Sequence, residues 1–172
     1  EIIIIYINKI RGINMINKLP KIELHCHLDG SVRVDTIIDI AKKENIKLEL
    51  YEKCDVEKLV QVPNDCTSLN EYLKRFDLAN KVMQSRENIK RVTFELLEDA
   101  QKENVKYIEV RFAPLLHLNG GLSIEEVIQS AIDGINEAEK MYDIKGNIIL
   151  CCMRTMSEDD AILVVEEGKK FL

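Results

Sequence analysis

Two histidines two positions apart, with an aspartate just beyond them, are the residues in this sequence best suited to chemistry. His25 and His27 lie in an alternating segment, 21–28, and Asp29 follows it directly. Residues i and i+2 of a β-strand point to the same face, so both imidazoles can bind one divalent cation, whereas Cys26 points to the other face. The Asp-Gly turn beyond the strand end is well placed to meet a polar substrate.

A second interpretation of the same pair is that both histidines are hydrogen-bonded core residues, as an isolated H-x-H usually is. Two observations favour a functional pair. The chain has only three histidines, and two of them share one strand face beside an Asp-Gly turn. From the residues alone, a metal site and a structural pair both remain open.

The elements that must position these residues follow from hydrophobic periodicity and turn signals. Alternating or continuous apolar character predicts three strands, at 21–28, 105–113 and 146–153. The third is apolar enough to be buried on both faces. Helical spacing, with capping signatures at three of the starts, predicts helices at 34–44, 68–76, 87–102 and 123–141 and from 157 onward, with a loop at 59–67.

Strands that alternate with helices predict a parallel sheet with right-handed crossovers, and therefore an α/β fold. At this level a doubly wound sheet and a barrel both remain open. The 172 residues fall short of the roughly 250 typical of a closed eightfold barrel. Neither a G-x-G-x-x-G nor a P-loop follows any predicted strand, so nucleotide-phosphate binding of those kinds is unsupported.

Composition narrows the class of protein further. The chain is 46% apolar and 31% charged, which is typical of a globular domain. A net charge of −6 argues against nucleic-acid binding. The five cysteines form no C-x-x-C pair, which favours reduced thiols in the cytoplasm over disulfides or a thiolate zinc site. The apolar run 2–7 is too short to span a membrane. No oligomeric state is predicted.

The first fourteen residues differ in character from the rest. Segment 1–14 is rich in Ile and Asn and has no starting methionine, whereas Met15 opens ordinary globular patterning. We therefore expect residues 1–14 to be extraneous or translated upstream sequence and Met15 to be the true start. The alternative is a genuine N-terminal strand or arm.

Three blocks in order along the chain resemble the adenosine deaminase family of metal-dependent amidohydrolases. They are LPKIELHCHLDGS at 19–31, YIEVRFAP at 107–114 and LCCMR at 150–154. The resemblance extends from about Lys18 to Leu172. It implies a partial (β/α)8 TIM barrel, in which residues 15–172 are the first three βα units of a single barrel domain whose C-terminal part is missing.

The resemblance also implies a site at the C-terminal mouth of that barrel. It places one Zn²⁺ per subunit there, with His25 and His27 as the first two metal ligands. His27 would also contact the substrate, and Asp29 would hydrogen-bond the ribose 5′-hydroxyl. The family lines its purine pocket with a helix that matches Leu69, Tyr72, Leu73 and Phe76. Plain core packing explains the spacing of those four residues equally well.

The activity implied by the resemblance is hydrolytic deamination of adenosine and 2′-deoxyadenosine by a zinc-activated water, with release of ammonia. The partner is thus a small purine nucleoside. The catalytic general acid Glu and a further His belong to later family blocks, expected beyond Leu172, so this chain alone should be inactive. Two alternatives remain. One is a deaminase of adenine or a modified adenine nucleoside, although adenine-specific relatives tend to carry Glu at the position of Asp29. The other is a catalytically incomplete purine-binding module.

The remaining polar residues are expected to have structural roles. His117 does not match the third metal ligand of the family, so we expect it on the surface or bracing a loop. Glu109 and Arg111 should share one face of the second strand and brace each other, because an unpaired buried charge is costly. Arg154 ends the third strand, and Glu23 should share the histidine face one step deeper.

Overall fold

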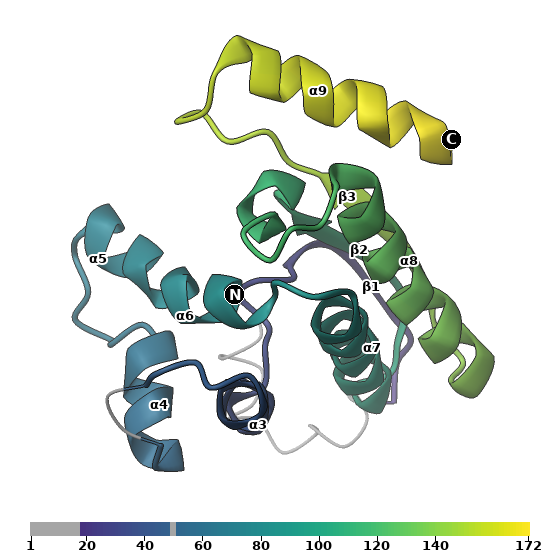
Figure 1. The fold of residues 1–172 in the computed structure, drawn as a ribbon. Coiled ribbons are helices and arrows are strands. Elements are labelled where there is room, and N and C mark those ends of the chain that lie inside the picture. The colour runs from purple at the N-terminus through teal and green to yellow at the C-terminus, as the bar shows by residue number, and fades with distance from the viewer. Residues whose placement is uncertain (1–17, 49–50) are drawn as a thin grey trace.

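The computed structural model describes residues 18–48 and 51–172, and its centre is a parallel three-stranded sheet (Figure 1). The strands β1 (Lys21–His27), β2 (Val105–Phe112) and β3 (Lys145–Leu150) lie side by side in chain order. Every connection between neighbours therefore crosses over through helices, as parallel pairing requires. The α/β prediction is confirmed.

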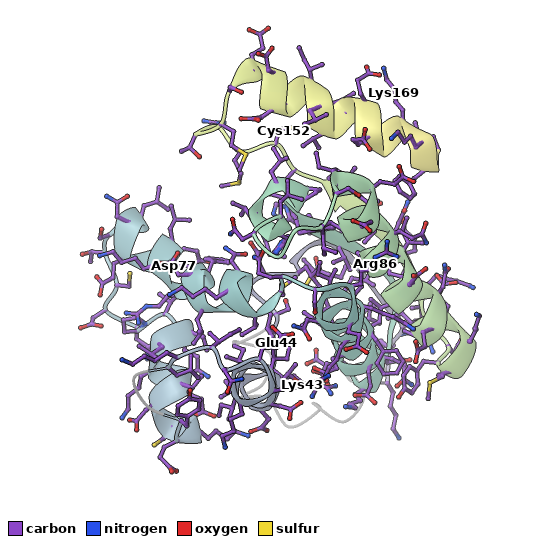
Figure 2. All side chains as sticks on the ribbon, viewed as in Figure 1. Lys43, Glu44, Asp77, Arg86, Cys152 and Lys169 are labelled. Carbon is purple, nitrogen blue, oxygen red and sulfur yellow. The ribbon has the colours of Figure 1, made fainter. Side chains whose placement is uncertain are left out.

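Helices fill the connections between the strands and follow the last one. The first connection is mainly helical, and its helices are α3 (Val34–Lys43), α4 (Lys53–Val60), α5 (Leu69–Leu73), η1 (Lys74–Phe76), α6 (Asp77–Val82) and α7 (Arg86–Lys102). The second connection and the segment after β3 contain η2 (Pro114–His117), α8 (Ile124–Met141), α9 (Glu158–Gly168) and η3 (Lys169–Phe171). In Figure 2, Cys152 lies on the connection between β3 and α9.

The hydrophobic core lies between one face of the sheet and the pair α7 and α8. Alternate residues of β2, namely Ile108, Val110 and Phe112, are almost fully buried on that side. The two helices approach so closely that a Cβ at Gly134 would lie 2.5 Å from the carbonyl oxygen of Lys90. A glycine in mid-helix is unfavourable by itself, so its presence here reflects this helix–helix contact.

The two faces of the sheet carry different chemistry. The face opposite α7 and α8 carries Tyr107, Glu109 and Arg111 of β2, which are only half-buried. His27 is in register with Arg111, so it belongs to this open face. Parallel registration thus gathers charged and imidazole side chains on one side and apolar side chains on the other.

A bulge near the middle of β1 changes the alternation of that strand. Glu23 pairs with Ile108 and Cys26 pairs with Val110, so three steps along β1 match two along β2. Glu23 therefore stands on the helix side in the register, and not on the histidine face as predicted from strict alternation. The prediction was wrong because a bulge inserts one residue and reverses the facing of those before it.

The helices confirm most of the predicted boundaries. In each of α3, α7 and α8, one end agrees with the prediction and the other end differs from it by one residue. The predicted helix 68–76 is α-helical only to Leu73 and continues as the 3-10 turn η1, and the helix α6 that follows it was not predicted. Helix α4 was missed: residues 59–60, assigned to a loop, are its last two. Its apolar residues Val56, Leu59 and Val60 have helical spacing, so the signal was present.

The third strand differs from its prediction in length and burial. It ends at Leu150 rather than Met153, and its residues are half-buried or exposed. The prediction of burial on both faces was wrong because α7 and α8 cover only one face of the sheet, and β3 is its edge strand among the described residues. The predicted start of the following helix is confirmed at Ser157, which caps α9.

Two further expectations concern the N-terminal segment and membrane spanning. The expectation for residues 1–14, with Met15 as the start, lies outside the described residues. Among those described, no helix is both long and apolar enough to cross a membrane.

Candidate metal and substrate site

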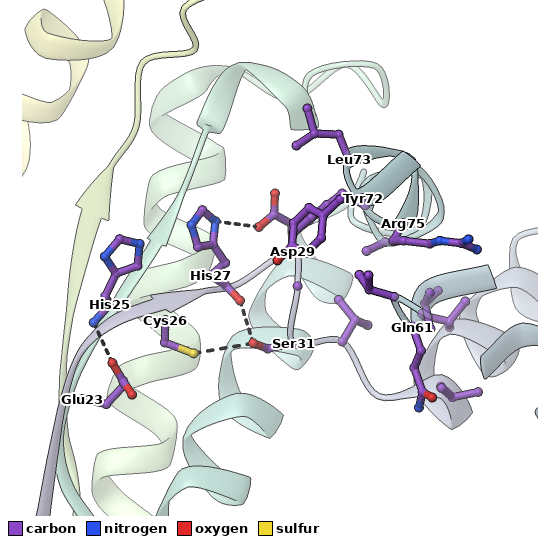
Figure 3. Close-up of a pocket in the computed structure, with 18 residues that line it drawn as sticks. Glu23, His25, Cys26, His27, Asp29, Ser31, Gln61, Tyr72, Leu73 and Arg75 are labelled. Atoms are coloured by element: carbon purple, nitrogen blue, oxygen red, sulfur yellow. Dashed lines mark hydrogen bonds and ion pairs between the residues drawn. The ribbon is translucent and has the colours of Figure 1, made fainter. Parts of the chain in front are cut away.

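The two histidine rings project together from the open face of β1, as the sequence predicted (Figure 3). Their centroids are 5.5 Å apart, and the rings are inclined by 38°. The side chain of His27 is 47% exposed. Cys26 points to the opposite side of the strand and approaches the hydroxyl of Ser31 at 3.6 Å. Among the described residues the pair is therefore not enclosed.

Glu23 supports the histidine strand from the other side. It extends away from the His25 ring (Figure 3), and its Oε1 accepts a hydrogen bond from the backbone N–H of His25 at 2.8 Å. The bulge removes that N–H from the regular ladder, and the carboxylate provides the acceptor that the strand then lacks. Glu23 therefore fixes the backbone that carries the first imidazole.

Arg111 contacts His25 across the open face of the sheet. Its Nη1 lies 3.0 Å from Nε2 and 3.4 Å from Nδ1 of that ring. A guanidinium can only donate, so the nitrogen that accepts from it carries a lone pair, which is the form that binds a metal. The predicted bracing of Arg111 by Glu109 is replaced by this contact, while Glu109 accepts from the Tyr107 hydroxyl at 3.1 Å.

Asp29 lies just past the end of β1, beside His27. Its Oδ1 is 3.5 Å from His27 Nδ1, within the range of an ion pair when that ring is protonated, and this buried oxygen has no hydrogen-bond partner among the described residues. Burial raises the pKa of the Asp29 carboxyl, and the neighbouring His27 opposes that rise. A buried carboxylate oxygen without a donor is well suited to accept a hydrogen bond from a ligand hydroxyl.

Glu23, His25, His27 and Asp29 line an open pocket of about 1250 Å³ between the end of β1 and the helices that follow it, and Arg111 is not among its lining residues. Tyr72, Leu73 and Phe76 form part of its wall, whereas Leu69 is 71% exposed and is not among the lining residues. Phe76 stands edge-on to the His27 ring at 6.3 Å between centroids. The strand end and the helical wall are therefore in direct contact.

Several lining residues were not singled out from the sequence. Val60, Gln61 and Val62 belong to the end of α4 and the loop after it, so they were missed together with that helix. Arg75 also lines the pocket, but its Nη1 donates to the carbonyl of Lys58 at 2.8 Å. That carbonyl belongs to the last turn of α4, where partial negative charge attracts a cation.

The described residues provide some of the ligands that a metal needs. Two imidazoles stand together, but no group of three or more His, Cys, Asp or Glu side chains within 18–48 and 51–172 is arranged to hold an ion. The donor chemistry suits a divalent ion such as zinc, which prefers four ligands in structural sites and three with an open position in catalytic sites. By its chemistry the pair could supply two of these ligands.

His117 is removed from this site and fully buried. Its Nδ1 lies 3.0 Å from the carbonyl oxygen of Met83, and its ring packs near Phe112. The loop-bracing role predicted for it is confirmed, and the alternative surface role is wrong. Arg154 is exposed in the turn after β3 and contacts none of the pocket residues in the described hydrogen bonds.

Solved structures share this arrangement of strands and helices. A zinc-containing amidohydrolase from Burkholderia ambifaria matches with a TM-score of 0.78 at 23% identity, over 91% of this chain and 42% of that one. A complex of ADAL with IMP matches with a TM-score of 0.76 at 30% identity, over 92% of this chain and 48% of that one. The fold is thus a partial (β/α)8 barrel that supplies its first three βα units.

The sequence comparisons identify the family within that fold. Residues 20–171 match the family profile described as adenosine deaminase, and the chain belongs to that family. It is 63% identical over 155 residues to an adenosine deaminase of Clostridium botulinum, covering 90% of this chain and 46% of that protein. An adenosine deaminase of Clostridium perfringens is 59% identical over 159 residues, covering 92% and 48%. The chain spans about half the length of these curated relatives.

Proposed function

We propose that the complete protein hydrolyses adenosine, and 2′-deoxyadenosine, to the corresponding inosine and ammonia. The observation that carries the proposal is the meeting of His25, His27 and Asp29 in one pocket of a chain that belongs to the adenosine deaminase family. The pocket has paired imidazoles at one end and an apolar wall beside them, which suits a molecule with a polar sugar and an aromatic base.

His25 and His27 would hold a zinc ion together with ligands from outside the described residues. The proximity of the two rings and the exposure of the His27 side chain fit such an ion. Bound zinc would lower the pKa of a coordinated water towards ~7, which provides hydroxide at neutral pH. Glu23 then has a supporting role, because it holds the backbone N–H of His25 in place.

The other pocket residues would bind and orient the nucleoside. Asp29 would accept a hydrogen bond from the ribose 5′-hydroxyl through the oxygen that has no partner. Tyr72, Leu73 and Phe76 would cover the purine and exclude water from it. Leu69, which the family resemblance placed in the same wall, would join only if the helix moved towards the pocket.

Charge in the pocket favours a nucleoside over a nucleotide. Arg75 is the only Lys or Arg among the residues that line it, and its guanidinium is directed to the Lys58 carbonyl. The carboxylate of Asp29 would repel a 5′-phosphate. Some related structures contain nucleotides, including one of arabidopsis ADAL with GMP that is 29% identical to this chain. For this chain we place adenosine first and a modified adenine nucleoside or adenine second.

A non-catalytic purine-binding module is the third candidate, and one specific observation favours it. The described residues hold two metal-binding imidazoles and no third ligand. If the sequence that completes this barrel has no third histidine and no H-A-x-E-like block, the enzymatic proposal fails.

The cysteines bear on the proposed compartment. The five cysteines are all free, which supports the cytoplasm as the proposed compartment.

The decisive experiment uses a complete enzyme. Residues 18–172 would be joined to the part of the C. botulinum adenosine deaminase that lies beyond the matched segment. The joined enzyme is expected to deaminate adenosine at least about a hundredfold more efficiently than adenine or AMP, measured as kcat/KM. A well-folded joined enzyme that turns over adenine or AMP but not adenosine would overturn the proposal.

A variant pair tests the metal role of the histidines. His27→Ala should reduce bound zinc well below one per chain and lower kcat by about a thousandfold or more. In the joined enzyme, His117→Asn serves as the matched control for zinc content, because within residues 18–172 it removes the one histidine outside the pocket. Equal zinc loss in both variants would refute the assignment.

A further inference from the structure

The turn between α6 and α7 is fastened to the loop after β2 by two side chains. His117 on that loop is buried, and its Nδ1 donates to the carbonyl oxygen of Met83 at 3.0 Å. Since a carbonyl only accepts, the proton is on Nδ1, and Nε2 is left buried without a partner among the residues that the structure describes. This fixes one neutral tautomer of the ring, and burial lowers its pKa to about 4.

Gln84, the next residue of the same turn, both donates a hydrogen bond to the loop and accepts one from it. Its Nε2 donates to the Leu116 carbonyl at 3.0 Å, and its Oε1 accepts from the Asn119 backbone N–H at 3.0 Å. The same Nε2 also donates to the Asn80 carbonyl, in the last turn of α6, at 2.6 Å. One amide group thus connects helix α6 to two positions of the loop.

The backbone of the loop comes equally close. A Cβ at Gly120 would overlap the carbonyl oxygen of Gln84 and lie 3.3 Å from its Cβ. Only glycine allows this approach, so the contact does not depend on either polar side chain. We call the contacts of His117, Gln84 and Gly120 across this junction the clasp.

The clasp holds the buried end of a helical arm, residues 69–82. At that end, Ala79 and Val82 are almost fully buried, whereas Tyr72 and Leu73 at the other end are 44% and 49% exposed. The bond from Arg75 to the Lys58 carbonyl holds the middle of the arm. In the described hydrogen bonds no side chain of 69–73 bonds outside the arm, so the position of this tip depends on the base. At roughly 1.5 Å per residue the arm is about 20 Å long, so a tilt of about 10° at the base would move the tip by about 3 Å.

We propose that the clasp is a positioning device that sets how far Tyr72, Leu73 and Phe76 reach over the pocket. It acts through the arm and touches no reacting group, so His117, Gln84 and Gly120 are positioning residues. Loss of the clasp contacts at Met83 would let the arm tilt, and its side chains would then move relative to the substrate. The substrate part of the inference rests on the proposed function, and the arm part rests on the contacts alone.

Amide hydrogen exchange on the 172-residue chain tests the arm directly. His117→Leu removes the bond to Met83, Gln84→Ala removes the bonds to the loop, and His117→Asn keeps a donor at the position of Nδ1. We expect exchange in 69–76 to become about tenfold faster in the first two variants and to return towards the wild-type rate in the third. Gln129→Ala is the matched control, because Gln129 bonds only to Asp133 on an exposed helix face.

Kinetics of the joined enzyme described above test the effect on substrate. Gln84→Ala should raise the KM for adenosine about tenfold while kcat changes far less, because binding is weakened and the metal side is untouched. Unchanged exchange in 69–76, or an equal acceleration across β1, β2 and the arm, would overturn the proposal, since the clasp would then contribute only general stability. If the unmodified joined enzyme has no activity, the proposed function fails, and exchange alone decides on the clasp.

Discussion

Burial separates the three histidines of this chain into two kinds. The rings of His25 and His27 are held on an open face, where a cation or a substrate can reach their lone pairs. His117 is enclosed and keeps a single proton on Nδ1. Residue type alone therefore does not distinguish the exposed pair from the buried ring, and the place of each ring in the fold does.

His117 should make stability fall in mild acid. Its pKa is lowered from 6.5 to about 4 by burial, so the unfolded chain binds a proton more readily than the native one. Its contribution is complete above pH 6.5 and is lost as the pH falls towards 4, by up to about 3 kcal/mol. Urea unfolding of the 172-residue chain between about pH 7 and pH 4.5 measures this loss.

His117→Asn is the control for that measurement. Asparagine can donate to Met83 and does not titrate, so the difference in unfolding free energy between the two proteins should shrink or reverse as the pH falls. The acid sensitivity of other groups is common to both proteins and cancels in the difference. A difference that stays constant over this pH range would show that the buried imidazole does not titrate as assigned.

At the scale of the elements, two of the three predicted serine caps form reciprocal boxes. Ser123 accepts from the Glu126 N–H at 3.2 Å, and Glu126 accepts from the Ser123 N–H at 2.7 Å. The bond from Arg86, followed by those from Ser123, lowers the pKa of Glu126 to about 2. Ser68 caps only α5, and its bond from Glu71 is 3.5 Å long.

Ser123→Ala should therefore cost more than Ser68→Ala. Loss of the cap on the 18-residue helix α8 is expected to lower the free energy of unfolding by about 1 kcal/mol. Loss of the weak cap on α5 should cost much less, because that helix has no fully buried residue. Urea denaturation of both variants gives the two values, and equal costs would contradict the importance of the reciprocal bond.

The sequence predicted the elements where periodicity is strong and missed them where tertiary contacts decide. Helices α7 and α8 have long amphipathic patterns, and their predicted ends are nearly correct. The bulge moves the side chain of Glu23 to the other face of the sheet. The alternating sequence does not reveal this bulge, so the predicted face of that residue was wrong. The clasp joins residues 83–84 to residues 116–120, which no local pattern relates.

The same limit applies to the site. Strand alternation and the Asp-Gly turn were enough to predict that His25, His27 and Asp29 lie on one side of the strand end. All three line one pocket. The contact of Arg111 with His25 required the register between two strands, which only the folded sheet provides. The wall of the pocket required the path of the chain through α4 and α5, and α4 was not predicted.

At the scale of the whole molecule, the described sheet has two outer edges without a strand partner. β1 and β3 flank β2 and pair with no further strand among residues 18–48 and 51–172. Ile22 and Leu24 of β1 are 68% and 59% exposed. Exposed edges of this kind invite pairing with other chains. The curated relatives are about twice as long as this chain, so they contain residues that could supply further strands.

The 172-residue chain by itself should therefore be a weak zinc binder without deaminase activity. Two imidazoles leave two of four ligand positions to solvent, so zinc should be lost on dialysis, whereas the joined enzyme should retain about one ion per chain. Metal analysis after dialysis and an adenosine assay on both proteins measure this, at low concentration to limit association through the sheet edges. Stoichiometric zinc and turnover in the chain alone would show that it assembles a complete site by another route, for example by pairing its edges with a second copy.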